Sequence, residues 1–478
     1  MVKGIAKQQK KESTIVQIKT EYLFLIIGLI FGLQFVFTNP PWQTNDEDRH
    51  FIHSYFLSQG YILPKQGQDK IGGVVPVNIY EIPARFQGIR FSETVKISKA
   101  KLEEAEKIPL NENNKQFFHN QHYNINPVGF IPSAFGIFIG QTINDNPVWL
   151  NWWGRIGDLI FYLVIIFFAI KIIPIFKNVI FLYALTPMSI YQGSSVTYDA
   201  VNISLTFLIF AVIIKFALDE KSFIGWKEFL LIMLLIIIHR FSKDGYPLIP
   251  LSMILIPIEK YKLSLKPILV YLIIFVSAFI IFKLPDWTWK QIINLQHYKL
   301  ETPKTLKKDL VGSFPMNLEL TLQNPGKFFK DMFLNLNHFR QEWAGGTIGR
   351  FGYSYTLLPD WFFLLHGLIL IIVAYLESGK KYILKTWQKS ASLLIAFGSI
   401  FGIIIMSYFY SPVGASQIFG LQGRYFINAI PFLLLVLYNN NLEIKEWKKY
   451  GSIVLSIYII LSLIYTLLYI NNVFYTEP

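Results

Sequence analysis

Long apolar runs dominate this chain and leave few folds open to it. Four of them contain little or nothing charged: Leu230–Ile238, Ile268–Ile281, Phe363–Tyr375 and Ile453–Ile470. Only 16% of the 478 residues are charged and 53% are hydrophobic, whereas a soluble protein carries about a quarter charged residues. Runs of this length and composition are typical of helices that cross a bilayer. The sequence therefore predicts an all-α, polytopic membrane protein.

The charge pattern and the lack of cysteine exclude several classes of function. The net charge of +13 does not indicate nucleic-acid binding, because the lysines cluster between apolar segments instead of forming one continuous face. The chain has no cysteine, which excludes disulfides, thiolate metal sites, iron–sulfur clusters and cysteine nucleophiles. The first apolar run, Tyr22–Phe37, is followed by Asn39-Pro-Pro-Trp and not by a cleavage site of small residues, so we expect a retained helix.

Lysine-rich connectors decide how the apolar segments should cross. Residues 1–20 are basic, so the N-terminus is predicted to be cytoplasmic. If the short, Gly/Pro-broken segment 127–141 crossed fully, the lysine-rich connectors at 260–266 and 380–389 would fall outside. If it is re-entrant or lies flat, every lysine-rich short connector is cytoplasmic, so we predict eleven spans with the N-terminus inside and the C-terminus outside. The predicted spans are 22–37, 151–172, 177–191, 197–217, 228–241, 246–258, 267–284, 359–376, 390–410, 424–438 and 450–471.

This count divides the chain into four parts. They are a cytoplasmic basic N-terminus over 1–20, a transmembrane core over 21–284 with an outer loop over 39–126, a second large outer loop over 285–358, and C-terminal transmembrane helices over 359–478. In the first outer loop, Thr44 and Glu47 have the spacing of a capping box. That spacing predicts a helix over about 45–58, whose aromatic residues would let it lie along the membrane interface.

This predicted helix begins with an acidic motif. On a helix, Asp46, Glu47 and His50 share roughly one face. A carboxylate there could accept a proton from an attacking hydroxyl, with His50 hydrogen-bonding it or helping to bind a metal. The alternative is a solvated helix start with acidic residues favoured by the helix dipole. A divalent ion (Mg²⁺ or Mn²⁺) between Asp46, Glu47 and a phosphate is compatible with the pattern, although the sequence requires no cofactor.

Cations on the same predicted outer face suggest a phosphate partner. Arg240 and Lys243 lie on an outer turn, where positive charge is under-represented, and either a phosphate or a salt bridge of Lys243 with Asp244 would explain them. Arg424 opens a predicted span, and backbone N–H groups at a helix start favour anions. The alternative for Arg424 is an interfacial arginine that anchors the helix end.

Aromatic and acidic residues on that face are candidates for binding a sugar or an acceptor. The candidates are Trp42, Asp199, Glu342, Trp343 and Tyr425. Asp199 begins a predicted span, and a plain helix-start residue explains it as well. Trp343 precedes a glycine-rich stretch that could form a lid or a sugar-stacking surface, or an ordinary flexible loop.

Three motifs together resemble a known family. They are Pro40-Pro-Trp-Gln-x-x-Asp46-Glu47-x-x-His50-Phe, Ser195-Val-x-Tyr-Asp199-Ala and Gln422-Gly-Arg424-Tyr-Phe-Ile-x-x-Ile-Pro431. The combination resembles a bacterial family of uncharacterised predicted membrane proteins that looks like a branch of the GT-C glycosyltransferases, and it covers about residues 20–440. The resemblance implies a GT-C helical core, a polyprenyl-phosphate sugar donor and transfer outside the cytoplasmic membrane. It also implies that Asp46 or Glu47 has the carboxylate role of these enzymes.

The predicted reaction is an inverting sugar transfer. Asp46 or Glu47 would deprotonate or orient an acceptor hydroxyl, which attacks C1 of a lipid-phosphate sugar, while Arg424, with Lys243, stabilises the leaving phosphate. The expected partners are a polyprenyl-phosphate-linked donor, a cell-envelope glycan acceptor and membrane lipids.

Two other functions stay open: a transporter or flippase of lipid-linked glycans, and a non-catalytic scaffold of a polysaccharide-assembly complex. A transporter should carry polar residues deep within its spans. The main charged candidates in the spans are Arg155 and Asp158, near one end, and this scarcity argues against translocation.

Overall fold

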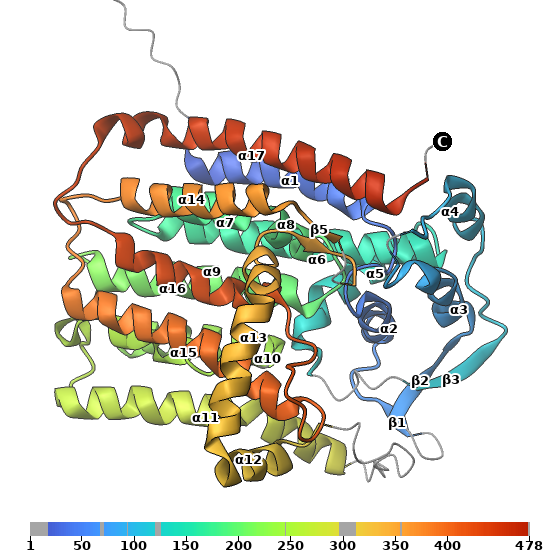
Figure 1. The fold of residues 1–478 in the computed structure, drawn as a ribbon, viewed down its shortest axis with the longest axis horizontal. Coiled ribbons are helices and arrows are strands. Elements are labelled where there is room, and N and C mark those ends of the chain that lie inside the picture. Colours follow the sequence, from blue (N-terminus) through green and yellow to red (C-terminus); the bar gives the residue numbers. More distant parts are fainter. Residues whose placement is uncertain are drawn as a thin grey trace, which may run out of the picture.

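Long helices packed side by side form the body of the protein. The computed structural model describes residues 18–66, 71–92, 94–119, 126–243, 245–295, 312–353 and 356–476. The long helices are α1 (Thr20–Thr38), α6 (Pro147–Ile172), α9 (Tyr198–Leu218), α10 (Trp226–Ser242), α11 (Pro267–Leu295), α14 (Asp360–Leu376), α15 (Thr386–Tyr410) and α17 (Lys445–Phe474). The described residues between 39 and 119 gather at one end of these helices, on the right of Figure 1, which we call the loop end.

Several of the helices are apolar enough to cross a membrane. Among the described residues, α1, α9, α11, α15 and α17 have both the length and the composition of a span. Shorter apolar helical stretches cover Pro127–Gln141, Asp360–Leu376 and Gly423–Leu437. The chain is therefore a mostly helical protein with several candidate membrane spans, and the count of eleven and its orientation stay predictions.

Two predicted spans do not form one continuous α-helix. The 246–258 segment contains the 3-10 helices η4 (Ile249–Leu255) and η5 (Ile258–Lys260), and the 424–438 segment forms η7 (Gly423–Ala429), α16 (Ile430–Leu434) and η8 (Leu435–Leu437). The first contains Pro247, Pro250 and Pro257 and the second contains Pro431, and proline removes a backbone donor and interrupts the regular ladder. Apolar composition alone does not register such interruptions.

The predicted span at 177–191 is also broken, into α7 (Lys177–Ala184) and α8 (Pro187–Gly193). The break leaves the carbonyl of Ala184 and the N–H of Met188 without their helical partners. The hydroxyl of Tyr162 donates to the Ala184 carbonyl at 2.7 Å, and Met188 N–H donates to the carbonyl of Ile348 at 2.7 Å. The break therefore ties this segment to α6 and to the second large loop.

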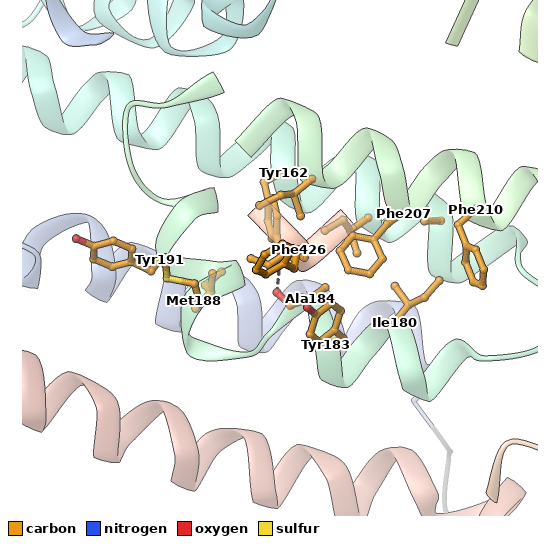
Figure 2. Packing of buried hydrophobic residues seen from close by; sticks show 14 of the residues in the cluster. Tyr162, Ile180, Tyr183, Ala184, Met188, Tyr191, Phe207, Phe210 and Phe426 are labelled. Carbon is orange, nitrogen blue, oxygen red and sulfur yellow. Dashed lines mark hydrogen bonds between the residues drawn. The ribbon is translucent and has the colours of Figure 1, made fainter. Parts of the chain in front are cut away.

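Around this break lies part of the buried apolar core (Figure 2). The ring centroids of Tyr183 and Phe207 are 6.0 Å apart with the ring planes inclined at 62°, and Phe426 of η7 lies in the same cluster. Such interlocked packing leaves little freedom for the start of α9 and the end of α8. Those two ends carry residues of the candidate site.

We expect the Tyr162 hydrogen bond to contribute to stability. Tyr162→Phe leaves the buried Ala184 carbonyl unpaired, which costs about 1–3 kcal/mol of unfolding free energy. Thermal unfolding in detergent should show a lower midpoint for this variant than for Tyr450→Phe, which alters an exposed ring. Equal midpoints would show that the carbonyl finds another partner.

The segment predicted to be re-entrant forms η3 (Pro127–Phe130) and α5 (Ile131–Gln141). α5 packs closely along the first half of α6, where a Cβ atom on Gly136 would lie only 2.1 Å from the carbonyl oxygen of Trp153. Glycine at this position allows the two backbones to approach.

Both ends of this segment lie at the loop end. A Cβ atom on Gly129 would be 2.6 Å from the carbonyl oxygen of Ser242, the last residue of α10. Beyond α5, Asn146 donates to the carbonyls of Ala105 and Ile108 in the first large loop, at 2.8 and 2.6 Å. A re-entrant segment would have this arrangement.

The first large loop contains both helices and a small sheet. It contains α2 (Glu47–Ser58), α3 (Asn78–Arg85), η1 (Gln87–Ile89) and α4 (Lys99–Ala105). It also contains an antiparallel sheet of β1 (Lys65–Gln66), β2 (Ile71–Pro76) and β3 (Lys115–His119), in the order β1-β2-β3. α2 agrees with the helix predicted over 45–58. The expectation of an all-α chain omitted the sheet, because its β2–β3 pairing joins residues 39 to 47 positions apart, for example Gly73 with Phe118.

The second large loop also folds. α11 continues to Leu295, past its predicted end at 284, and is followed by α12 (Phe314–Gln323) and α13 (Pro325–Gly345). A short hairpin of β4 (Arg350–Phe351) and β5 (Thr356–Leu357) precedes α14. Figure 1 shows α13 running across its neighbours instead of along them. This crossing brings its C-terminal residues to the loop end, beside the acidic motif.

Candidate functional site

A buried arginine organises the acidic motif. Arg155 of α6 has no exposed surface and donates to both carboxylate oxygens of Glu47 at 2.7 Å each. It also donates to three backbone carbonyls at the end of α1: Val36 at 2.8 Å, Asn39 at 2.6 Å and Pro40 at 2.8 Å. Helix ends leave such carbonyls without intrahelical partners. Arg155 therefore ties the end of α1 to the start of α2.

Glu47 is occupied by this ion pair. Its carboxylate is fully buried and also accepts from the backbone N–H of Val196 at 3.1 Å. Because both carboxylate oxygens accept hydrogen bonds, Glu47 fixes the start of α2 against α6. Glu47 could bind a metal shared with Asp46 only by giving up its hydrogen bonds with Arg155. In the part of the chain that the structure describes, no group of three His, Asp or Glu residues lies together for a metal.

Asp46 has a different environment. It stands before the first residue of α2 in the left-handed region (φ 62°), a conformation that Asp and Asn adopt more readily than most residues. Its side chain does not cap the helix, and Asp46 lines a cavity of about 500 Å³. Of the two predicted carboxylates, Asp46 is the one that reaches an open pocket.

This cavity, the Asp46 pocket, joins the two large loops. Its walls are mainly aromatic and polar: Asn45, Asp46, Phe91, Phe339, Glu342, Trp343, Arg350, Tyr353 and residues 417–422. Trp343 stacks on Phe339 with ring centroids 5.5 Å apart, and Glu342 pairs with Arg350 at 2.9 Å. Aromatic faces beside fixed polar groups can bind a sugar ring.

A second group of charges is centred on Asp199. Lys243 forms an ion pair with one carboxylate oxygen of Asp199, and Arg424 Nη1 lies 3.3 Å from the other. Arg424 Nη1 also donates to Gln192 at 3.1 Å. The Lys243 ammonium lies over the rings of Tyr198 and Tyr425, at 4.8 and 4.4 Å from their centroids. The structure thus joins three predicted site residues, Asp199, Lys243 and Arg424, which we call the Asp199 cluster.

The Asp199 cluster could bind an additional anion. Two cations share one carboxylate, and Arg424 is 3% exposed. Within the described ranges, Nε and Nη2 of Arg424 are buried and make no hydrogen bond. Buried donors without an acceptor are costly and rare in folded proteins, and an oxyanion would satisfy them.

The ionisation of Lys243 responds to this environment. Burial lowers the pKa of Lys243 to about 8, against the opposing effects of Asp199 and, further away, Asp46. Arg424 adds to the lowering by repulsion. Asp46 thus acts on the Lys243 ammonium in the same direction as Asp199, favouring its charged form.

Lys243 also opens onto a third feature, the Lys243 pocket, of about 540 Å³. Its polar end carries Arg240, Lys243, Tyr246 and Tyr425, and its apolar walls come from α11, α15 and Phe419. Arg240 donates to the carbonyl of Phe282 at 2.9 Å and lies over that ring. Phe419 lines both this pocket and the Asp46 pocket, so the two adjoin.

Trp42, predicted to contact a sugar, and His50, predicted to support the catalytic carboxylate, both lie in the core. Trp42 is fully buried, with its ring 5.7 Å from Phe51 and 5.4 Å from Phe86, so it offers no face to a sugar in this structure. His50 is buried against the rings of Phe130 and Tyr198. Neither residue lines either pocket: Trp42 lies in the turn before α2, and His50 lies on the buried face of α2. Asp244, the alternative partner considered for Lys243, lies outside the described residues.

Sequence reasoning missed several members of the site. Arg155 was noted only as a charge near a span end, although a lone arginine in an apolar helix usually has a buried partner. Tyr353 and Arg90 were missed entirely. Arg90 pairs with Asp48 at 3.2 Å and lies 4.4 Å from the Tyr353 ring centroid, beside the Asp46 pocket. No local pattern connects these residues.

Comparison with known proteins identifies a family whose description names no activity. A family model described as "Predicted membrane protein (DUF2142)" matches residues 29–436. Searches of curated proteins and of solved structures each found no match. The matched range includes the acidic motif, the Asp199 cluster and both pockets.

Proposed function

Because this chain belongs to the DUF2142 family of predicted membrane proteins, whose description names no reaction, we propose its function from the site. We propose that it is an integral-membrane, inverting glycosyltransferase. It transfers a sugar from a polyprenyl-phosphate donor to a cell-envelope glycan. The reaction takes place at the outer face of a bacterial cytoplasmic membrane, where the loop end would lie.

One observation carries the proposal: a pocket with buried cations and apolar walls adjoins a pocket with a carboxylate and aromatic walls. The Lys243 pocket suits a ligand that is anionic at one end and hydrocarbon at the other. A lipid-linked phosphate has this character, and guanidinium and ammonium groups bind phosphate oxygens strongly. The Asp46 pocket suits a hydroxyl-rich acceptor.

The proposed step is a single displacement. The acceptor hydroxyl oxygen attacks C1 of the sugar while the bond from C1 to the phosphate oxygen breaks. The hydroxyl proton passes to the Asp46 carboxylate, and the electron pair of the broken bond stays on the polyprenyl phosphate. Arg424, with Lys243, stabilises the charge on that leaving group. Attack opposite the leaving phosphate inverts the anomeric centre.

The test is a transfer assay with the purified full chain in vesicles that contain polyprenyl-phosphate-linked sugars. We expect a new glycosidic bond, detected by mass spectrometry of the product. Arg424→Gln should lower turnover about 10²- to 10³-fold, because one preorganised donor to developing charge has about this effect. Arg85→Gln, which alters a half-exposed arginine of α3, is the matched control. Equal turnover of the two variants would exclude Arg424 as the phosphate ligand.

The pKa of Lys243 predicts a pH dependence. Lys243 carries its charge below pH 8 and loses it as the pH rises through about 8. The ratio kcat/KM for the donor should therefore fall above pH 8, since this ratio reports ionisations of the free enzyme. Lys243→Arg keeps its charge and should shift the fall to higher pH. A fall at the same pH in both proteins would assign it to another group.

Two other functions are distinguishable in the same vesicles. Movement of a lipid-linked glycan across the bilayer without a new glycosidic bond would favour a transporter or flippase. Full complementation of a deletion strain by an Asp46→Asn variant would favour a non-catalytic scaffold. A divalent ion stays an open proposal, tested by adding a chelator to the transfer assay.

A further inference from the structure

A third hollow in the protein has a lining unlike the other two. It is a cleft of about 700 Å³ between α14 and α15, with α16 as its floor, which we call the α14–α15 cleft. Leu364, Leu368 and Ile371 of α14 line it and are 66%, 55% and 51% exposed. These residues follow helical spacing along about 10 Å of α14. The cleft therefore has an open apolar side along helices of membrane-spanning composition.

The cleft has a polar end at the loop end. Arg340 of α13 is its one charged lining residue. Trp343, one turn further along α13, lines both this cleft and the Asp46 pocket. An occupant of the cleft could thus extend directly into the pocket that holds Asp46.

The cleft is separate from the Lys243 pocket. Ile400 and Ile404 of α15 line the cleft, whereas Gly402, Ile403, Met406, Ser407 and Tyr410 line the Lys243 pocket. At about 100° per residue, the centres of these two sets lie about 110° apart around the helix. The two apolar hollows share no lining residue and face different sides of α15, so we treat them as separate sites.

We propose that the α14–α15 cleft binds the hydrocarbon chain of the acceptor, so that the acceptor is a lipid-anchored glycan. This inference rests on the proposed function, which places the donor chain in the Lys243 pocket. The continuity with the Asp46 pocket assigns the cleft to the acceptor, because Asp46 receives the acceptor proton. Arg340 at the polar end matches the phosphate that links a glycan to its lipid.

Three glycines allow a matched test. A Cβ atom on Gly367 in the cleft, on Gly402 in the Lys243 pocket, or on the exposed Gly88 would meet no atom within 4 Å. Gly367→Leu should fill the cleft, Gly402→Leu the Lys243 pocket, and Gly88→Leu neither. None of the three requires the backbone to move.

The first measurement is photo-crosslinking. The probe is a polyprenyl phosphate with a diazirine at the far end of its chain, added to the full chain in phosphatidylglycerol vesicles. We expect crosslinks to α14 and to α11. Gly367→Leu should reduce those to α14 about 10-fold and leave those to α11, and Gly402→Leu should do the reverse. The proposal is overturned if Gly367→Leu changes nothing, or if diazirine-labelled phosphatidylglycerol labels α14 equally well, since bulk lipid then fills the cleft.

The second measurement separates this proposal from the proposed function. Gly367→Leu should raise KM for an acceptor with a lipid chain and leave KM for the same glycan without its chain. Equal use of both acceptors by the unaltered protein would overturn a lipid-anchored acceptor. Asp46→Asn should stop transfer without altering the crosslinks. Crosslinks in the expected places without any transfer would therefore refute the glycosyltransferase and retain the chain-binding cleft.

Discussion

Asp46→Asn should lower the turnover of sugar transfer about 10³-fold, within the range of a lost general base. The amide cannot accept the proton of the acceptor hydroxyl. Asparagine tolerates the left-handed backbone at this position (φ 62°), and no capping hydrogen bond of the side chain is lost. The variant should therefore fold normally, so that its turnover reports chemistry alone.

The measurement compares kcat and the unfolding midpoint of Asp46→Asn with those of Asp360→Asn. Asp360 is exposed at the start of α14, on the same predicted face, and lines neither pocket. Asp360→Asn should behave like the unaltered protein in both measurements. Normal turnover of Asp46→Asn would remove Asp46 from the reaction and direct attention to Asp199.

Arg155→Met should have the largest effect on stability. It leaves the buried Glu47 carboxylate without its partner and three carbonyls of the α1 end without a donor. Removing one partner of a buried ion pair costs about 3–5 kcal/mol. The unfolding free energy in detergent should fall by about this amount, and turnover should fall with it because Asp46 loses its position.

A double variant tests the cause. Glu47→Gln on top of Arg155→Met removes the uncompensated charge, so the double variant should be more stable than Arg155→Met alone. The two effects should therefore not add. If the losses add, Arg155 acts mainly through the carbonyls of Val36, Asn39 and Pro40. If the single variant Glu47→Gln loses turnover while its unfolding midpoint stays unchanged, Glu47 has a direct role in the reaction.

Short-range sequence patterns predict part of the fold and of the candidate site. The capping spacing of Thr44 and Glu47 located α2 to within two residues of its start, and hydropathy located the apolar helices. Such signals depend on free energies within a few residues along the chain. The same reasoning placed Asp199, Lys243 and Arg424 among the candidates, because a charge beside an apolar segment is conspicuous in one dimension.

Local pattern could not rank those candidates. Asp46 and Glu47 are adjacent and chemically alike, and what separates them is Arg155, which lies 108 positions from Glu47. Lys243 was considered with its neighbour Asp244, whereas its partner in the structure is Asp199, 44 positions away. By sequence Trp42 is a plausible stacking residue, but in the structure the rings of Phe51 and Phe86 enclose it.

The acidic stretch after the first helix illustrates both halves of the result. By itself, the sequence determined that this is a mostly helical chain with apolar segments and that a carboxylate-rich motif follows the first of them. Only the tertiary structure decided that Glu47 forms an ion pair with Arg155 and that Asp46 reaches a pocket. It also decided that Asp199, Lys243 and Arg424 come together in one cluster. Hydropathy and capping are properties of neighbours in the chain, whereas burial and ion pairing depend on residues that only folding brings together.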